Sequence, residues 1–170
     1  MHPHARLIRS FYEAFQAKDA ETMNAWYDPE ARFSDPVFPD LNAEQVKAMW
    51  SMFCSRSKNL QIEFGDIQAN EEEGRAMWLA LYTFQATGQS VINRIESTFT
   101  FREGKILTHT DAFNFYGWAR QALGFRGLML GWTPLVKNKV RDSARRTLEQ
   151  FIAQSAPSST QQPGRSPSRS

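Results

Sequence analysis

The spacing of apolar residues changes character partway along the chain. Up to about residue 56 it is helical. Residues 6–17 carry an aromatic helix face, made of Leu7, Ile8, Phe11, Tyr12 and Phe15. A second short helix is expected after Asp19, running to about Tyr27, because Asp28–Pro29 stops it. A third is expected over residues 43–56, with Asn42 as its N-cap.

From residue 60 the period becomes two, which is typical of strands. Four strands are expected, over residues 60–70, 74–88, 90–104 and 105–118, with turns at the glycines that separate them. A shorter strand over residues 31–38 should break at Pro36. Helices that come first and an antiparallel meander that follows predict an α+β domain, with helices on one face of a curved, mostly antiparallel sheet.

Three segments follow from this pattern. Residues 1–118 form the α+β domain, and residues 119–154 form a C-terminal helical extension that holds a basic amphipathic helix. Residues 155–170 are rich in Ser, Pro and Gln and predict a disordered tail.

Composition narrows the class of protein. The chain has 170 residues, 41% of them hydrophobic, which suits one domain with a real core. The only cysteine, Cys54, excludes an intrachain disulfide framework and a cysteine-rich zinc site. The N-terminus lacks the apolar core of a secretory signal, and no apolar run approaches the roughly 20 residues of a membrane span. We expect a cytoplasmic protein.

Charge is distributed unevenly. Residues 1–125 hold 12 Lys and Arg against 16 Asp and Glu. Residues 126–170 hold 8 Lys and Arg against 2 Asp and Glu. The basic end suggests an acidic partner or surface. Its helix has three interpretations: a solvated face, reversible attachment to an anionic membrane through residues 126–153, or contact with nucleic acid. The balanced total charge argues against a nucleic-acid binder.

The order of elements is helix, helix, a short strand with Asp35–Pro36–Val37, helix, then four long strands. Together with FYEAFQAKD at residues 11–19, it resembles the nuclear transport factor 2-like superfamily over residues 5–116. Within that superfamily the chain is most similar to the SnoaL-like and ketosteroid isomerase-like branch. The resemblance implies a cone-shaped sheet, a homodimer formed through the outer sheet face, and no need for an organic cofactor or a metal ion.

The resemblance also implies roles for four residues. Asp35 stands in the segment that carries the general base of ketosteroid isomerase, and Tyr12 matches the tyrosine that stabilises the oxyanion. Ser97 occupies the place of a neutral aspartic acid that donates a hydrogen bond, and a hydroxyl is a weaker donor. Asp111 matches an acid/base aspartate of SnoaL-like cyclases on the last strand, and His109 shares its strand face.

Each of these residues also has a structural interpretation. An Asp before Pro commonly caps a turn, so Asp35 is either a turn residue or a base in apolar surroundings. Tyr12 alone is a core aromatic. His109 and Asp111 form either a pair that satisfies buried polar groups or an acid–base couple. Two such groups on one strand do not make a metal site.

The sequence thus predicts a small-molecule acid–base enzyme, of isomerase, cyclase or dehydratase type, acting on an apolar carbonyl compound. Asp35, Tyr12, Asp111 and His109 are its candidate catalytic residues. The candidate substrate-binding residues are Ser97, Phe33, Phe38, Trp50, Phe99 and Phe113. The alternative is a non-catalytic binder of a lipid-like ligand, docked peripherally on a membrane.

Overall fold

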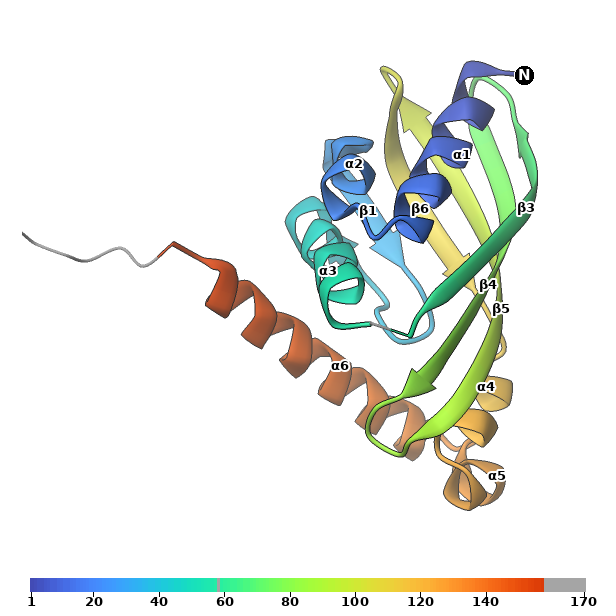
Figure 1. Cartoon of the computed structure of the whole chain (residues 1–170), viewed down its shortest axis with the longest axis vertical. Coiled ribbons are helices and arrows are strands. Elements are labelled where there is room, and N and C mark those ends of the chain that lie inside the picture. The colour runs from blue at the N-terminus through green and yellow to red at the C-terminus, as the bar shows by residue number, and fades with distance from the viewer. Residues whose placement is uncertain (58, 158–170) are drawn as a thin grey trace, which may run out of the picture.

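A computed structural model describes residues 1–57 and 59–157 (Figure 1). Three helices precede the long strands, as the apolar spacing predicts. The helices are α1 (Pro3–Gln16), α2 (Ala20–Ala25), α3 (Ala43–Arg56), α4 (Phe115–Ala122), α5 (Phe125–Leu130) and α6 (Pro134–Ser155). The strands are β1 (Tyr27–Ser34), β2 (Leu41–Asn42), β3 (Gln61–Ala69), β4 (Glu73–Phe84), β5 (Gln89–Arg102) and β6 (Lys105–Ala112).

The strands form one curled sheet of order β2-β1-β6-β5-β4-β3. Every neighbouring pair is antiparallel except β1 and β6, which run parallel. Irregular register in β1, β3 and β6 bends the strands, because an extra residue increases local twist. Helices α1, α2 and α3 lie on the concave face (Figure 1). The fold is therefore the α+β cone that the sequence predicts.

Local sequence explains where the helices begin. The Asn42 side chain accepts from the backbone of Gln45, and the Gln45 side chain accepts from the backbone of Asn42, so α3 starts with a capping box. The Asp19 side chain caps α2 by accepting from the backbone N–H of Thr22 at 3.0 Å. Both N-caps are those that the sequence indicates.

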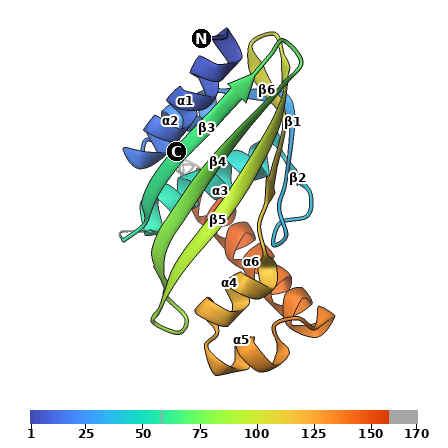
Figure 2. The ribbon, with the colours of Figure 1, turned by 90° about the vertical axis from the view of Figure 1, so that its right-hand side faces the viewer.

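Aromatic side chains fill the space between the helices and the sheet. Phe11 and Phe15 of α1 and Trp50 of α3 are almost fully buried and meet edge to face. Burying each such side chain contributes about 1.5–3 kcal/mol relative to leaving it exposed. The opposite face of β3, β4 and β5 carries no helix within the described residues (Figure 2). It is the face through which a homodimer is predicted.

Strand β1 begins earlier than the spacing predicts. The sequence suggests helix up to about Tyr27, but α2 ends at Ala25 and β1 starts at Tyr27. The reason is tertiary: Tyr27 pairs with Ile106 of β6, and the Trp26 carbonyl accepts from the Ile106 N–H at 2.8 Å. Pro29 is tolerated because the pairing shifts register between Tyr27 and Arg32.

The C-terminal segment is helical, and α6 runs from the α4 end of the sheet past α3 (Figures 1 and 2). Its apolar side packs on the main core through Leu148, which is buried, and through Ala144, Phe151 and Ile152. The tail that the sequence predicts to be disordered starts at residue 155. Ser155 is still the last residue of α6, and residues 158–170 lie outside the described residues.

Candidate active site

Strand register brings the predicted polar residues together on the concave face. Ser97 of β5 lies opposite Asp111 of β6. On the other side of β6, Ser34 of β1 lies opposite Thr110. Asp35 is the next residue after Ser34, so it lies beside Asp111, although the two are far apart in sequence. The Ser97 hydroxyl and the carboxylates of Asp111 and Asp35 thus follow one another in one row, across β5, β6 and the segment directly after β1.

Three hydrogen bonds of Ser97, two accepted and one donated, determine how the Asp111 carboxylate is held. Ser97 Oγ accepts from the Tyr12 hydroxyl at 2.7 Å and from Trp78 Nε1 at 3.0 Å. The hydroxyl of Ser97 in turn donates to Asp111 Oδ1. Ser97 is fully buried, so all of its hydrogen-bonding capacity is used within the protein.

The Tyr12 hydroxyl is committed to this network. Burial raises the pKa of Tyr12 well above its ordinary value, the charge of Asp111 acts in the same direction, and the hydrogen bond with Ser97 opposes both. The hydroxyl therefore keeps its proton. Because that proton is donated to Ser97, Tyr12 reaches the carboxylate only through Ser97.

His109 connects Asp111 to a second branch of the network. Its Nε2 lies 2.9 Å from Asp111 Oδ1, and its Nδ1 lies 2.7 Å from the Tyr27 hydroxyl. Trp50 Nε1 donates to the same hydroxyl at 2.8 Å. The Tyr27 proton is then free to point at Nδ1, which places the imidazole proton on Nε2, directed at Asp111. His109 and Asp111 are both buried, so this is a structural pair as well as a candidate acid–base couple.

Asp35 has one engaged and one free carboxylate oxygen. Oδ1 accepts from the backbone N–H groups of Val37 and Phe38 at 2.6 and 2.5 Å, which is the turn-capping role. Oδ2 has no hydrogen-bond partner among the described residues. Burial raises the pKa of Asp35 to about 7, and the charge of Asp111 adds to it, against the lowering effects of the two backbone N–H groups and Arg141. Asp35 is thus a turn residue with one free carboxylate oxygen, and burial brings the pKa of its carboxyl group close to neutral pH.

Asp111 likewise leaves an oxygen free. Both of its hydrogen bonds end on Oδ1, and Oδ2 has no partner in the part of the chain that the structure describes. Asp35 and Asp111 therefore each present one unbonded oxygen from adjacent strands. Like charges at such a site disfavour double ionisation, and the charge of Asp111 is one cause of the raised pKa of Asp35.

Two further residues beside Asp35 are absent from the sequence prediction. Tyr82 of β4 accepts from Trp118 Nε1 at 2.7 Å, and its own proton has no acceptor among the described residues. Burial raises the pKa of Tyr82, and the charge of Asp35 contributes to the rise. Arg141 of α6 donates from Nε to the Pro36 carbonyl at 2.9 Å. The alternation in β4 that places Trp78 inward also marks Tyr82 as inward, but nothing in the sequence places α6 against Pro36.

The predicted aromatic residues surround this row but differ in exposure. Four are buried in the core, namely Phe33, Phe38, Trp50 and Phe99, and the fifth, Phe113, is half-buried. Phe33 and Phe99 contact the His109 ring, with centroids 5.1 and 4.3 Å apart. They form the apolar wall behind the carboxylates, and only Phe113 leaves surface free for a ligand.

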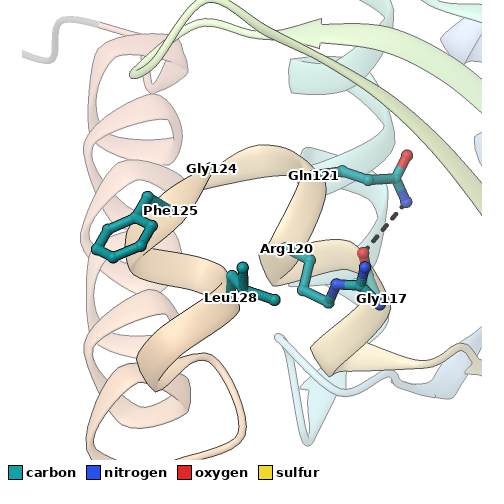
Figure 3. A pocket seen from close by; sticks show the side chains of 6 residues that line it. All are labelled: Gly117, Arg120, Gln121, Gly124, Phe125 and Leu128. Carbon is teal, nitrogen blue, oxygen red and sulfur yellow. Dashed lines mark hydrogen bonds between the residues drawn. The ribbon is translucent and has the colours of Figure 1, made fainter.

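The structure shows a cavity of ≈ 460 Å³ away from these carboxylates (Figure 3). It lies between α4 and α5 and is lined by Gly117, Arg120, Gln121, Gly124, Phe125 and Leu128. Gln121 Nε2 donates to the Gly117 carbonyl at its edge. A substrate space beside Asp35 stays a prediction.

Two features of the described residues bear on alternative roles. Across residues 1–57 and 59–157, no three His, Cys, Asp or Glu side chains are grouped so that they could hold a metal ion. None of the described helices combines the length and the apolarity that a bilayer crossing requires.

Comparison with known proteins links this geometry to a family. The family model described as the SnoaL-like domain matches residues 8–109. No curated protein matches the sequence.

Solved structures share the fold at low sequence identity. A nuclear transport factor 2-like protein of unknown function from Burkholderia pseudomallei superposes with a TM-score of 0.63 at 18% identity, covering 72% of this chain and 98% of that one. A Catenulispora acidiphila protein with a ketosteroid isomerase-like fold, in complex with trimethylamine, superposes with a TM-score of 0.61 at 10% identity. The match covers 75% of this chain and 97% of that one. An epoxide hydrolase of M. tuberculosis superposes with a TM-score of 0.56 at 17% identity, and the match covers 75% of this chain and 92% of that one.

Proposed function

This chain belongs to the SnoaL-like domain family of the nuclear transport factor 2-like superfamily, and on that premise we propose that it is a small-molecule acid–base enzyme. Its substrate is an apolar carbonyl compound, and its reaction is an isomerisation, cyclisation or dehydration. The observation that carries the proposal is the proximity of Asp35, which directly follows β1, to Asp111 of β6, each with an unbonded oxygen and with an aromatic wall behind them.

Asp35 is the general base in this proposal. Its free Oδ2 takes a proton from the carbon next to the substrate carbonyl. The electron pair of the broken C–H bond forms a C=C bond, and the π pair of the carbonyl moves to its oxygen, which gives an enolate. The protonated Asp35 then returns the proton to another carbon. A base whose pKa is about 7 both accepts and returns a proton efficiently at neutral pH.

Tyr82 is the donor that this site offers to the enolate oxygen. Its hydroxyl proton has no acceptor among the described residues, and Trp118 fixes the oxygen from the other side. Burial keeps the hydroxyl protonated, as its raised pKa indicates. A fixed donor in a dry site stabilises developing charge without reorganising.

Tyr12, Ser97 and His109 act through Asp111 in this proposal. The hydrogen bonds of Ser97 and His109 end on Asp111 Oδ1, and Tyr12 donates to Ser97, so Asp111 Oδ2 keeps no partner among the described residues. Asp111 then acts as the second acid or base. Tyr12 is a positioning residue, because its proton is used by Ser97.

The test is exchange of substrate hydrogen for solvent deuterium. Planar cyclic enones are incubated with the protein in D₂O, and loss of the signal from the proton next to the carbonyl is followed by NMR. We expect exchange with wild type and at least about a hundredfold loss in Asp35→Asn, because general-base catalysis contributes about 10²–10⁴ in rate. The matched control is Asp40→Asn, an exposed carboxylate paired with Arg32.

Binding of a phenolate separates catalysis from the alternative function. A phenolate mimics the enolate, and its absorbance reports binding. If the protein is an enzyme of this kind, the Asp35→Asn variant should bind the phenolate more tightly than wild type does, because a negative charge beside the anion is removed. A lipid-binding protein would bind the phenolate equally in both forms and exchange no deuterium, and that result would replace the enzyme proposal with the binding one.

A further inference from the structure

Large apolar side chains gather on the surface at α5 and the start of α6. Eight large hydrophobic residues are exposed in the described chain, and six of them lie between residues 125 and 135. We call these six the α5 patch: Phe125, Leu128, Met129, Leu130, Trp132 and Leu135. Trp132 is 71% exposed and Phe125 is 76% exposed. Isolated exposed hydrophobics are ordinary, whereas a cluster marks an interaction surface.

The fold itself holds this patch outward. α5 packs on α4 through glycines: a Cβ on Gly127 would lie 1.8 Å from the Ala119 carbonyl oxygen, and one on Gly131 would lie 2.9 Å from the Ala119 Cβ. At about 100° per residue, Phe125 and Met129 lie on the side of the helix opposite Gly127. The helix therefore buries its small face and presents its large apolar face to solvent.

A hydrogen bond fixes this orientation. The Tyr116 hydroxyl of α4 donates to the Leu128 carbonyl at 3.0 Å. The exposed face is thus held by a second contact between α4 and α5, independent of the glycines.

The segment that carries the patch holds charges of one sign. Residues 112–141 contain no Asp or Glu, and their five cations are Arg120, Arg126, Lys137, Lys139 and Arg141. Arg126 lies within α5 itself, and Lys139 is exposed on α6. Apolar side chains flanked by cations suit the headgroup region of an anionic bilayer. A second copy of the chain would place like charges against each other, which disfavours self-association through this face.

We propose that the α5 patch and its basic flanks dock this protein on the surface of an anionic lipid bilayer. The apolar side chains enter the boundary between headgroups and acyl chains, and the cations meet the lipid phosphates. The short α5 lies along the surface. This inference does not depend on the catalytic proposal, because none of the six patch residues belongs to the carboxylate site. Of the five flanking cations, Arg141 alone also lies beside Asp35.

Vesicle binding tests it directly. The full chain is sedimented with vesicles of phosphatidylcholine alone and with vesicles of phosphatidylcholine and phosphatidylglycerol in equal parts. We expect binding to the anionic vesicles only, weakened by added salt because exposed charges are screened. The double variant Phe125→Ser/Trp132→Ser should bind at least about tenfold more weakly, and Arg126→Gln about fivefold more weakly.

A matched control and a spectroscopic signal accompany the sedimentation. Ile92→Ser removes another exposed apolar side chain, on the outer sheet face, and should bind as wild type does. Trp132 is the only tryptophan of the five that is exposed, and all five lie within the described residues. Its emission should shift to the blue on anionic vesicles and resist quenching by acrylamide.

Three outcomes would overturn the proposal. One is equal binding to neutral and anionic vesicles. A second is unchanged binding of the Phe125→Ser/Trp132→Ser variant, whose folding is checked by circular dichroism. The third is a doubled mass without vesicles that this variant abolishes, because the patch would then be an interface between copies of the chain.

Discussion

Replacing Asp35 by Asn should stabilise the protein at neutral and alkaline pH and leave it unchanged in acid. The folded protein raises the pKa of Asp35 from 3.8 to about 7. Between about pH 4 and pH 7 the folded state therefore keeps a proton that the unfolded chain has released. Stability falls with rising pH wherever the folded state binds more protons, so the cost of the buried charge grows across this window and is complete above it.

The magnitude follows from the size of the pKa change. At 1.36 kcal/mol per pKa unit, the rise corresponds to about 4 kcal/mol. Asp35 is half-buried, so solvent screening reduces the expected difference to about 2–4 kcal/mol. Asn keeps an Oδ1 that accepts from the Val37 and Phe38 N–H groups but carries no charge.

The assay is urea unfolding followed by tryptophan fluorescence, at a series of pH values from acid to alkaline. We expect Asp35→Asn to match wild type within about 0.5 kcal/mol near pH 4 and to exceed it by about 2–4 kcal/mol near pH 8. Asp40→Asn, at an exposed ion pair with Arg32, is the control and should show no such trend. At each pH, the difference in the free energy of unfolding between variant and wild type is free of the contributions of all other titrating groups, because both proteins share them.

A stability difference that does not change with pH would refute this reasoning. So would an Asn variant that is less stable than wild type near pH 8. Either result would mean that the two backbone N–H groups outweigh burial, that Asp35 ionises in the ordinary range, and that its role is to hold the turn. The general-base proposal would then lose its physical basis.

Further predictions concern packing and caps, each measured as a change in the free energy of unfolding. Ser97→Ala should cost about 2–4 kcal/mol because a buried tyrosine hydroxyl and a buried indole N–H lose their acceptor, whereas Ser90→Ala, exposed on the same strand, should cost under about 0.5 kcal/mol. Gly74→Ala should cost about 1–3 kcal/mol because its Cβ would lie 2.6 Å from an isoleucine methyl group, whereas Gly65→Ala meets nothing within 4 Å and should be neutral or stabilising. Asn42→Ala should cost about 1 kcal/mol through loss of the capping box, and a variant as stable as wild type would contradict that cap.

Local pattern was sufficient for most of the fold. The period of two placed β3 to β6, the aromatic stripe placed α1, and Asn42 marked the start of α3, because each depends on neighbours close in sequence. The end of β6 was wrong: the strand stops at Ala112 and α4 begins at Phe115, where the sequence suggests strand up to residue 118. Alternation also put His109 and Asp111 on one face, since side chains of a strand alternate whatever the strand pairs with.

Tertiary structure decided the rest. The parallel pairing of β1 with β6 places Asp35 beside Asp111, and it also starts β1 at Tyr27, where the sequence indicates helix. No spacing encodes such a pairing, because its partners are joined only through the whole sheet. The same holds for the outward face of α5, which follows from a contact between Gly127 and Ala119 that only the folded chain makes. Sequence thus named the candidate residues Asp35, Tyr12, Asp111 and His109, and long-range register and close approach decided which of them meet and which side chains face the solvent.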